Sequence, residues 1–554
     1  MKWLRKKLRA WRRASSRNES MVRWLGLSRV SGAADEPGLL LIQIDGLSRT
    51  QLELAMRRRR MPFLSKLMRN EHFKLHTMYS GVPSTTPAVQ GELFYGVRCA
   101  VPAFSFKDPA TGVIVRMVDS EPAAAIEARL AAQQEGLLAT GSAYSNIYTG
   151  GAAEPHFCAA SMGWNGMFSQ ATWLTWMGIV LWNWFSIART LVLMLLEVAI
   201  GLYDAIVGHW TGQKLDVELK YVPSRVAVSI GLRELITIGA SMDVTRGQAV
   251  VQLNFLGYDE QAHRRGPSSA FAHWSLKGID DAIKRVVKAA RASERRKYEV
   301  WIYSDHGQEH VVAYDTQYGR SIQEAVTEVL AGFMELTPAD RDGAVQTRQP
   351  TRVRWIGGFG RRLSGGKSDP PHEPSQPKAV AEIIAIGPVG HVYFAEDIDP
   401  EMLAQIAEQL VASAHVPTVL WRAADGGIAA QTTAGQFALP GDVTRVVGDE
   451  HPFLDDLADD LVELCDHEAA GQLVLLGWSA AAERPLSFAH ENGAHAGPGT
   501  QETEAFILAP AARQFHSSAR TYLRPNDLRL SALRQLGRGA ACDMPAVVAG
   551  HEVE

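Results

Sequence analysis

Short apolar runs that end in polar residues recur along the chain and predict the strands of a sheet. These runs occupy residues 38–45, 250–259, 298–306 and 504–510. Apolar runs of about four to eight residues are typical of strands buried on both faces of a parallel sheet. Segments with helical periodicity lie between or before them, at residues 50–70 and 277–296. The alternation predicts an α/β fold in which a mostly parallel central sheet is flanked by helices.

The pattern changes in the second half of the chain. Residues 361–378 hold too much Gly, Pro and Ser for either periodicity and predict a mobile loop. Residues 381–397 and 418–432 carry strand and hairpin signals, which indicate a smaller α+β subdomain. We therefore expect a basic amphipathic N-terminal segment at 1–37, an α/β core in three parts at 38–146, 247–320 and 441–554, an insertion at 147–246, and the subdomain at 321–440.

The expected insertion is poor in charge and rich in tryptophan. Between residues 155 and 203 only Arg189 and Glu197 carry a formal charge, and six of the fourteen tryptophans lie from Trp164 to Trp210. This composition is typical of the membrane interface and predicts one or two short membrane-embedded helices within residues 164–210. A buried helical hairpin or an oligomer interface is the alternative, because polar residues interrupt the apolar surface.

The first thirty residues are strongly basic, with ten Lys and Arg residues against one acid, Glu19. They lack the apolar stretch and the cleavage site of a secretory signal, so we expect the segment to be retained. Basic residues near a membrane are attracted to anionic lipid by about 1 kcal/mol each, which favours a membrane surface as a partner.

The overall composition and the cysteines indicate the cellular compartment and the class of partners. The chain has 554 residues, 46% of them hydrophobic, and a net charge of -4, which gives no global field to attract a nucleic-acid scaffold. The cysteines share no CxxC spacing and fit reduced thiols in the cytoplasm. They are Cys99, Cys158, Cys465 and Cys542. We expect the protein at the cytoplasmic side of a membrane, with a soluble cytoplasmic protein as the alternative; the oligomeric state stays open.

Carboxylates and imidazoles collect where the predicted strands end. In open α/β sheets ligands bind at the carboxyl ends of strands, so these side chains can converge although they are far apart in the chain. Mixed carboxylate and imidazole ligands suit zinc, with manganese as the alternative, and the number of groups predicts two metal ions. The candidate ligands are Asp45, Asp259, His263, Asp305, His306 and His495.

A pair of threonines in residues 81–96, "GVPSTTPAVQGELFYG", adds a candidate nucleophile. Pro87 is favoured at the first position of a helix, which predicts that Thr86 is its N-cap. The positive end of the helix dipole favours an alkoxide and a bound phosphate there, and a metal ion would lower the pKa of the hydroxyl further. We therefore predict Thr86 as the nucleophile, with Thr85 as the alternative.

The order of these motifs resembles the alkaline phosphatase superfamily and, within it, most closely the type I phosphodiesterase and nucleotide pyrophosphatase family. The resemblance covers roughly residues 38–110, 247–310 and 440–535 and leaves out 147–246. It is carried by Asp45-Gly46, Pro83-x-x-Thr86 followed by Gly96, Asp259-x-x-x-His263-x-x-Gly266-Pro267, Ser304-Asp305-His306-Gly307, and His495.

The resemblance implies a hydrolase of phosphoric esters that works through a phosphothreonine at Thr86. It implies one metal held by Asp45, Thr86, Asp305 and His306, and a second held by Asp259, His263 and His495. The family's asparagine beyond the nucleophile is replaced here by "AFSFKD", so Lys107 or Ser105 is the candidate contact to a phosphate oxygen. A Cys-x-Pro-x-Arg signature is absent, which argues against a formylglycine sulfatase.

Two rival functions stay open at this stage. The same chemistry ending on an alcohol acceptor would make the protein a phosphoryl or phospho-alcohol transferase. A non-catalytic membrane adaptor on the same fold would have lost ligands, whereas the motifs retain all seven residues. The insertion lies between the nucleophile and Asp259, where it can line the mouth of the site, and a membrane-proximal or lipid-linked phosphoester is the expected substrate.

Overall fold

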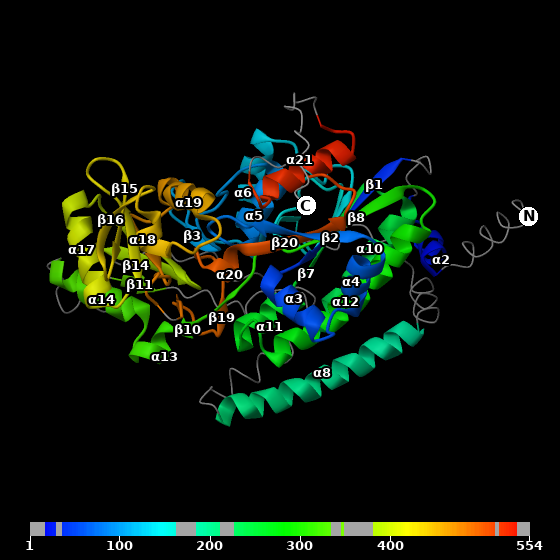
Figure 1. Cartoon of the computed structure of the whole chain (residues 1–554), viewed down its shortest axis with the longest axis horizontal. Coiled ribbons are helices and arrows are strands. Elements are labelled where there is room, and N and C mark those ends of the chain that lie inside the picture. Colours follow the sequence, from blue (N-terminus) through cyan, green and yellow to red (C-terminus); the bar gives the residue numbers. More distant parts are fainter. Residues whose placement is uncertain are drawn as a thin grey trace, which may run out of the picture.

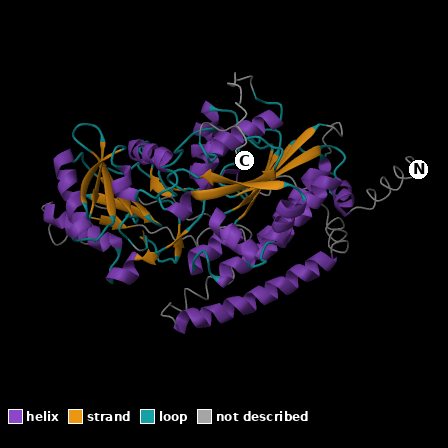
Figure 2. Ribbon diagram, in the orientation of Figure 1, coloured by secondary structure: helices purple, strands orange, loops and turns teal. Residues whose placement is uncertain are grey.

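The computed structural model describes residues 17–28, 36–161, 184–210, 226–333, 345–347, 380–482, 484–515 and 520–539. Two sheets organise these residues, a central sheet with helices on both sides and a second sheet at one end of the molecule (Figures 1 and 2). Residues 1–16 and the predicted loop 361–378 lie outside the described residues.

The central sheet has seven strands in the order β2-β20-β8-β1-β7-β5-β6. Five neighbouring strands are parallel: β8 (Lys297–Tyr303), β1 (Pro37–Ile44), β7 (Val250–Phe255), β5 (Ser142–Tyr144) and β6 (Glu154–His156). Strand β20 (Glu504–Pro510) pairs antiparallel with β8, and β2 (Phe73–Tyr79) pairs antiparallel with β20. The predicted α/β class with a mostly parallel sheet is confirmed.

Alternate residues of β1 explain why both faces of this sheet are covered. Leu40 and Ile42 belong to one buried cluster, whereas Leu39 and Leu41 belong to another, because successive side chains of a strand point to opposite faces. Helices of the first face are α2 (Arg17–Trp24), α3 (Arg49–Arg57), α4 (Pro62–Asn70), α10 (Arg233–Arg246), α11 (Gly257–Arg265) and α12 (Ala270–Ala292). Helices of the other face are α5 (Thr86–Tyr95), α6 (Ser120–Gln133) and α21 (Pro525–Gln535).

The helical stretch predicted at 50–70 is two helices. Ser48 caps α3 by accepting the backbone N–H of Gln51, and Pro62 opens α4 because a proline lacks the N–H that a continuous helix needs. The free N–H groups of Phe63 and Leu64 donate to the carboxylate of Asp280 on α12, at 2.8 and 3.0 Å. A side chain from another helix therefore supplies the cap.

The second sheet has seven strands in the order β11-β12-β13-β17-β14-β15-β16, all antiparallel except the β11-β12 pair. Its strands are β11 (Val345–Thr347), β12 (Ala381–Ile386), β13 (Val389–Phe394), β14 (Thr418–Arg422), β15 (Ile428–Thr432), β16 (Gly435–Leu439) and β17 (Leu473–Leu476). The helices around it are α13 (Tyr314–Tyr318), α14 (Ile322–Phe333), α17 (Pro400–Ala412), α18 (Val443–Val447) and α19 (Leu454–Asp466).

Sheet membership differs from the expected limits of the units at two points. Strand β6 joins the central sheet although it lies within the expected insertion 147–246. Strand β17 completes the second sheet although it lies beyond residue 440, because it pairs with both β13 and β14. Pairing between strands far apart in the chain leaves no mark in local periodicity, so the sequence could not place these limits.

The remaining described elements are short, except one helix in the insertion. The short ones are β3 (Ser105–Lys107), β4 (Ile114–Arg116), η1 (Ala159–Ser161), β9 (Glu309–His310), β10 (Val312–Ala313), β18 (Leu486–Ser487), β19 (Gly493–Ala494) and α20 (Thr500–Thr503). The long helix α8 (Trp184–Trp210) is followed by the π-helix η2 (Ala227–Leu232). Among the described residues, none of the helices combines the length and the apolar character that crossing a membrane requires. Residues 162–183 lie outside the described residues.

Candidate active site

The nucleophile turn brings a threonine hydroxyl to the end of the central sheet. Helix α5 begins at Thr86, with Thr85 as its N-cap and Pro87 as its second residue, so the helix starts one residue earlier than the sequence predicted. Thr86 Oγ1 lies 3.4 Å from Asp45 Oδ1 and 3.2 Å from His306 Nε2. Thr85 Oγ1 is buried without a hydrogen-bond partner among the described residues. The geometry therefore favours Thr86 over Thr85.

Two neighbouring parallel strands deliver the next group of side chains. Asp45 follows β1, and Asp305 and His306 follow β8 after one intervening residue. His306 Nε2 lies 3.3 Å from Asp305 Oδ2 and 3.7 Å from Asp45 Oδ1. All three residues are buried, with Asp305 and His306 fully inaccessible. The strand register thus sets two carboxylates and an imidazole around the Thr86 hydroxyl.

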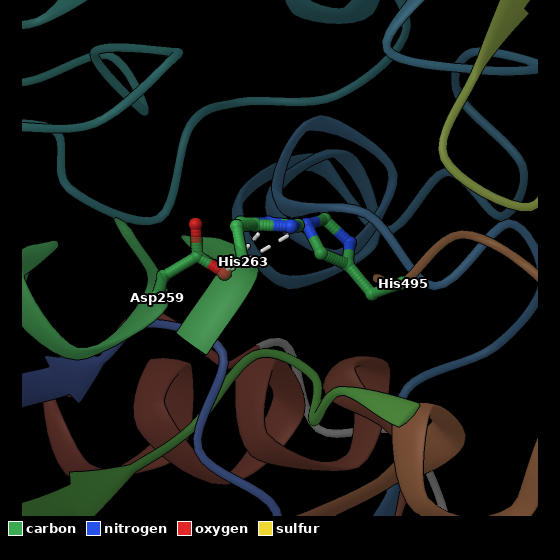
Figure 3. A group of neighbouring side chains, drawn as sticks. All are labelled: Asp259, His263 and His495. Carbon is green, nitrogen blue, oxygen red and sulfur yellow. Dashed lines mark ion pairs between the residues drawn. The ribbon is translucent and has the colours of Figure 1, made fainter. Parts of the chain in front are cut away.

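A second group forms beside it from three segments. Asp259 and His263 lie one turn apart on α11, which follows β7. His495 arrives from the far end of the chain, because β19 pairs antiparallel with β9, the strand just after His306. Asp259 Oδ1 lies 3.3 Å from His263 Nε2 and 3.8 Å from His495 Nε2 (Figure 3). The rings of His306 and His495 stack at 3.8 Å, which joins the two groups.

The structure therefore brings all seven predicted residues together, and we call this set the active-site cluster. It comprises Asp45, Thr86, Asp259, His263, Asp305, His306 and His495. Two subsets have ligand atoms that all lie within 4.8 Å of one another, the spacing that a shared metal ion requires. These subsets are Asp259 with His263 and His495, and Asp45 with Asp259 and His306.

Each histidine of the cluster is oriented through its second ring nitrogen. The Nδ1 acceptors are Gly493 O for His263 at 2.7 Å, Ser84 O for His495 at 2.7 Å, and Gly307 O for His306 at 2.9 Å. Donation from Nδ1 to a carbonyl leaves a lone pair on Nε2, which is the nitrogen that faces the carboxylates. Glu491 adds a carboxylate 3.0 Å from His263 Nδ1, which increases the basicity of that ring.

The carboxylates are also fixed by neighbours. The donors are Asn254 Nδ2 to Asp45 at 2.6 Å, the Gly46 N–H to Asp305 at 3.3 Å, and Gln308 Nε2 to Asp259 at 2.5 Å. Gly46 has a φ of 67°, and a Cβ at this position would lie 2.4 Å from Asp259 Oδ1. Only glycine lets the strand end approach the second group this closely.

Sequence reasoning missed three of these orienting residues: Asn254, Gln308 and Glu491. Asn254 carries a signal, because it is a polar residue within the buried strand β7. Gln308 lies two residues beyond His306, and Glu491 lies four residues before His495. Single polar residues in such loops have no spacing that distinguishes them from solvated ones.

The electrostatics of the cluster call for a cation. Burial raises the pKa of Asp45 well above its usual range, and the charges of Asp305 and Asp259 raise it further. Burial also raises the pKa of Asp305, although His306 and Thr86 act in the opposite direction. Asp305 Oδ2 has no hydrogen-bond partner among the described residues. Carboxylates packed this closely repel one another, and a divalent cation bound by them offsets the repulsion. The donor set therefore fits a metal ion.

Lys107 and Ser105, the expected contacts to a phosphate oxygen, interact with neighbouring strands in the structure. Lys107 Nζ pairs with Glu382 of β12 at 2.8 Å, and the backbone N–H of Lys107 donates to the Tyr393 hydroxyl of β13. Ser105 Oγ donates to Val115 O on β4 at 2.7 Å. Both side chains thus hold β3 against neighbouring strands. The replaced segment "AFSFKD" serves the junction between the two sheets.

Comparison with known proteins agrees with this geometry. The sequence model of the type I phosphodiesterase / nucleotide pyrophosphatase family matches residues 39–353, more than half of the chain. The chain belongs to this family. The match includes every residue of the active-site cluster except His495, and it confirms the resemblance seen in the motifs.

Members of this phosphodiesterase family are metal-dependent hydrolases of phosphoric esters, so the protein is an enzyme of that class. Phosphonoacetate hydrolase from Sinorhizobium meliloti 1021, in complex with phosphonoformate, has a TM-score of 0.43 and 13% identity, covering 92% of this chain and 100% of that chain. Murine ectonucleotide pyrophosphatase / phosphodiesterase 5, an inactive form in complex with AMP, has a TM-score of 0.45 and 10% identity, covering 91% and 95%. The search of curated proteins found no match.

Proposed function

We propose that the enzyme hydrolyses a phosphodiester or pyrophosphate bond through a phosphothreonine on Thr86, with two divalent metal ions, zinc in preference to manganese. The observation that carries this proposal is the Thr86 hydroxyl, which lies within 3.4 Å of both Asp45 and His306. The same hydroxyl belongs to the first turn of α5, where the helix dipole favours negative charge.

The residues divide into two metal-binding sets. Asp45, Thr86, Asp305 and His306 would hold one ion, and Asp259, His263 and His495 would hold the other. Bound ions would lower the pKa of the Thr86 hydroxyl and neutralise the charge that develops on the phosphoryl oxygens. Carboxylate oxygens and imidazole nitrogens are donors that zinc accepts readily.

The chemistry then takes two displacements at phosphorus. Thr86 Oγ1 forms a bond to phosphorus while the bond to the leaving oxygen breaks, and the leaving alcohol or phosphate takes up the threonine proton. Water next supplies a hydroxyl to phosphorus, the bond to Thr86 Oγ1 breaks, and the second proton of the water restores the hydroxyl. The role of the protein is to position and stabilise charge in both steps.

We further propose that the substrate is membrane-proximal or lipid-linked and that the enzyme acts at the cytoplasmic side of a membrane. The support is the uncharged, tryptophan-rich sequence from residue 155 to 188 and the basic residues 1–30. The free thiols of Cys99, Cys158 and Cys465 are consistent with a reducing compartment.

The chemical part is tested by metal analysis together with turnover. Purified protein is assayed on para-nitrophenyl phosphate, bis-para-nitrophenyl phosphate and the para-nitrophenyl ester of thymidine monophosphate, before and after chelation and with zinc or manganese added back. We expect two equivalents of zinc per chain, loss of turnover on chelation, and faster turnover of the two diesters. Phosphorylated glycerol in place of free product, when glycerol is present, would identify a transferase and contradict hydrolysis.

A further inference from the structure

The outward face of helix α8 is apolar. Leu195, Tyr203 and Val192 expose 72%, 70% and 64% of their surface. Leu191, Leu196, Val198 and Leu202 are exposed as well. Between residues 191 and 203 the exposed positions hold no charged residue. Apolar side chains gathered along one helix face at this density mark a binding surface, because water solvates them poorly.

Two charged residues of α8 contact the rest of the protein or are buried, although Arg189 stays 40% exposed. Glu197 is buried, and the Met194 side chain lies against Gly231 of η2. Arg189 pairs with Asp281 of α12 at 2.7 Å. This is the reverse of α12, whose apolar side chains are mostly buried, with Trp274 as an exception, while Lys277, Lys284 and Lys288 are exposed. A helix that meets water on its outer face has the α12 pattern, and α8 has the pattern of a helix that meets lipid.

We propose that the exposed face of α8 docks into one leaflet of an anionic lipid bilayer, with the helix lying in the plane of the membrane. Its 27 residues would lie along about 40 Å of that surface. The inference rests on the membrane-proximal part of the proposed function and is independent of its chemistry. It assigns the lipid contact to particular residues of α8.

Two features of the sequence favour lipid over a second copy of the chain. The residues that precede α8 continue its apolar character, because residues 155–188 carry no formal charge when His156 is neutral. The ten basic residues among the first thirty complement anionic headgroups. They lead into α2, which packs on the same face of the central sheet as α10 and α12, the face that α8 also adjoins through Arg189 and Asp281.

The docking face lies close to the active-site cluster. The π-helix η2 sits between α8 and α11, where Gln261 Nε2 donates to Ser229 Oγ at 3.1 Å. Helix α11 carries Asp259 and His263, and α8 runs beneath α11 and α12 (Figure 1). Helix α8 and the π-helix η2 therefore lie between the docked leaflet and α11, the helix that carries two of the candidate metal ligands.

The test is flotation of the full chain with vesicles of equal parts phosphatidylcholine and phosphatidylglycerol. A wash at about 1 M salt, where the Debye length is about 3 Å, removes the contribution of the basic N-terminus. Leu195→Glu is expected to weaken the salt-resistant binding at least about tenfold, because it replaces an apolar side chain that would be buried in the bilayer. Val192→Glu should behave alike. Met402→Glu makes a similar change at an exposed apolar position of α17 and should bind as the parent protein does.

Turnover of a soluble para-nitrophenyl ester separates this inference from the proposed chemistry. Loss of vesicle binding with unchanged turnover supports docking, whereas a Thr86→Ala protein that still binds vesicles shows that docking survives without catalysis. Equal salt-resistant binding by Leu195→Glu and the parent protein would overturn the proposal. A parent protein that does not bind vesicles would overturn it as well. That protein could be a dimer that Leu195→Glu splits into monomers, or a monomer in which another part of the chain covers α8.

Discussion

Within the part of the chain that the structure describes, two separate, mostly buried clusters of carboxylates and imidazoles have ligand atoms close enough together to share a metal ion. They differ in their counter-charge. The active-site cluster is one. The other, which we call the Arg246 cluster, consists of Glu154, His156 and Asp243 around Arg246. Arg246 reaches Glu154 at 2.6 Å and Asp243 at 2.9 Å, and its side chain is almost fully buried.

The pKa values show the consequence of that difference. Burial works to raise the pKa of Glu154, but the hydrogen bond and charge of Arg246 prevail and lower it. For Asp243 burial prevails and raises the pKa, although the charge of Arg246 acts in the opposite direction. In the active-site cluster burial raises the pKa of Asp45, and its nearest charges, Asp305 and Asp259, raise it further. The Arg246 cluster contains its own cation, whereas the active-site cluster must acquire one. Proximity of ligand atoms alone does not identify a metal site; the missing positive charge does.

The largest expected effect is loss of turnover in Thr86→Ala. Removing the nucleophile should lower kcat by at least about 10³-fold. The free energy of unfolding should change by no more than about 1 kcal/mol, because the bulk of the helix α5 contacts remains. Thr85→Ala is the matched control, and steady-state kinetics with thermal unfolding measures both. A Thr85→Ala protein that loses turnover while Thr86→Ala keeps it would reverse the assignment.

Next in size is the effect of removing the built-in cation with Arg246→Met. Two carboxylates would lose their buried partner, so the protein should be destabilised by about 3–5 kcal/mol. Arg422→Met is the matched control, because Arg422 pairs with Asp466 at the exposed surface, where such a pair contributes about 0–1 kcal/mol. Chemical denaturation gives both values. Metal content of the folded fraction should stay unchanged, and a drop in metal would show that the Arg246 cluster is not separate from the active site.

Metal stoichiometry then distinguishes the clusters residue by residue. His495→Ala removes one of three ligands from the second set, so metal affinity should fall at least about tenfold and the bound metal should approach one equivalent per chain. His156→Ala removes the imidazole of the Arg246 cluster and should leave two equivalents. Chelator competition with elemental analysis measures both proteins. Two equivalents and intact kinetics in His495→Ala would remove that residue from the site.

The residues that the sequence proposed lie together in the structure because most of them follow a strand end or belong to a glycine-rich turn. Asp45, Asp305 and His306 follow β1 and β8, and the parallel order of these strands brings them to one edge. His495 was a candidate ligand because it precedes a predicted strand, but its partners in space depend on the pairing of β19 with β9. A two-residue strand has no periodicity to detect.

Features that depend on contacts between distant segments could not be predicted from the sequence. Lys107 was a candidate phosphate contact by its distance from Thr86 in the chain, but the packing of β3 beside β12 pairs it with Glu382. The start of α5 was displaced by one residue, because proline is accepted at the second position as well as the first. The fold class followed from the apolar runs, whereas the limits of the second sheet required knowledge of which strands pair.

The smallest predicted effect concerns a third arrangement, a buried carboxylate with neither a metal nor an arginine. Asp280 accepts hydrogen bonds from the Phe63 and Leu64 N–H groups, and burial raises its pKa to about 6. Between pH 4 and 6 the folded protein then binds more protons at this site than the unfolded chain, so the site lowers stability as pH rises through that window. The change should amount to about 1–2 kcal/mol, and Asp280→Asn should abolish it while keeping one acceptor for the α4 cap. Urea denaturation at pH 4.5 and 6.5 measures the difference for both proteins. If the stability of the parent protein changes with pH over this interval as that of Asp280→Asn does, the prediction is wrong. The two backbone donors would then stabilise the ionised Asp280 carboxylate without a cation.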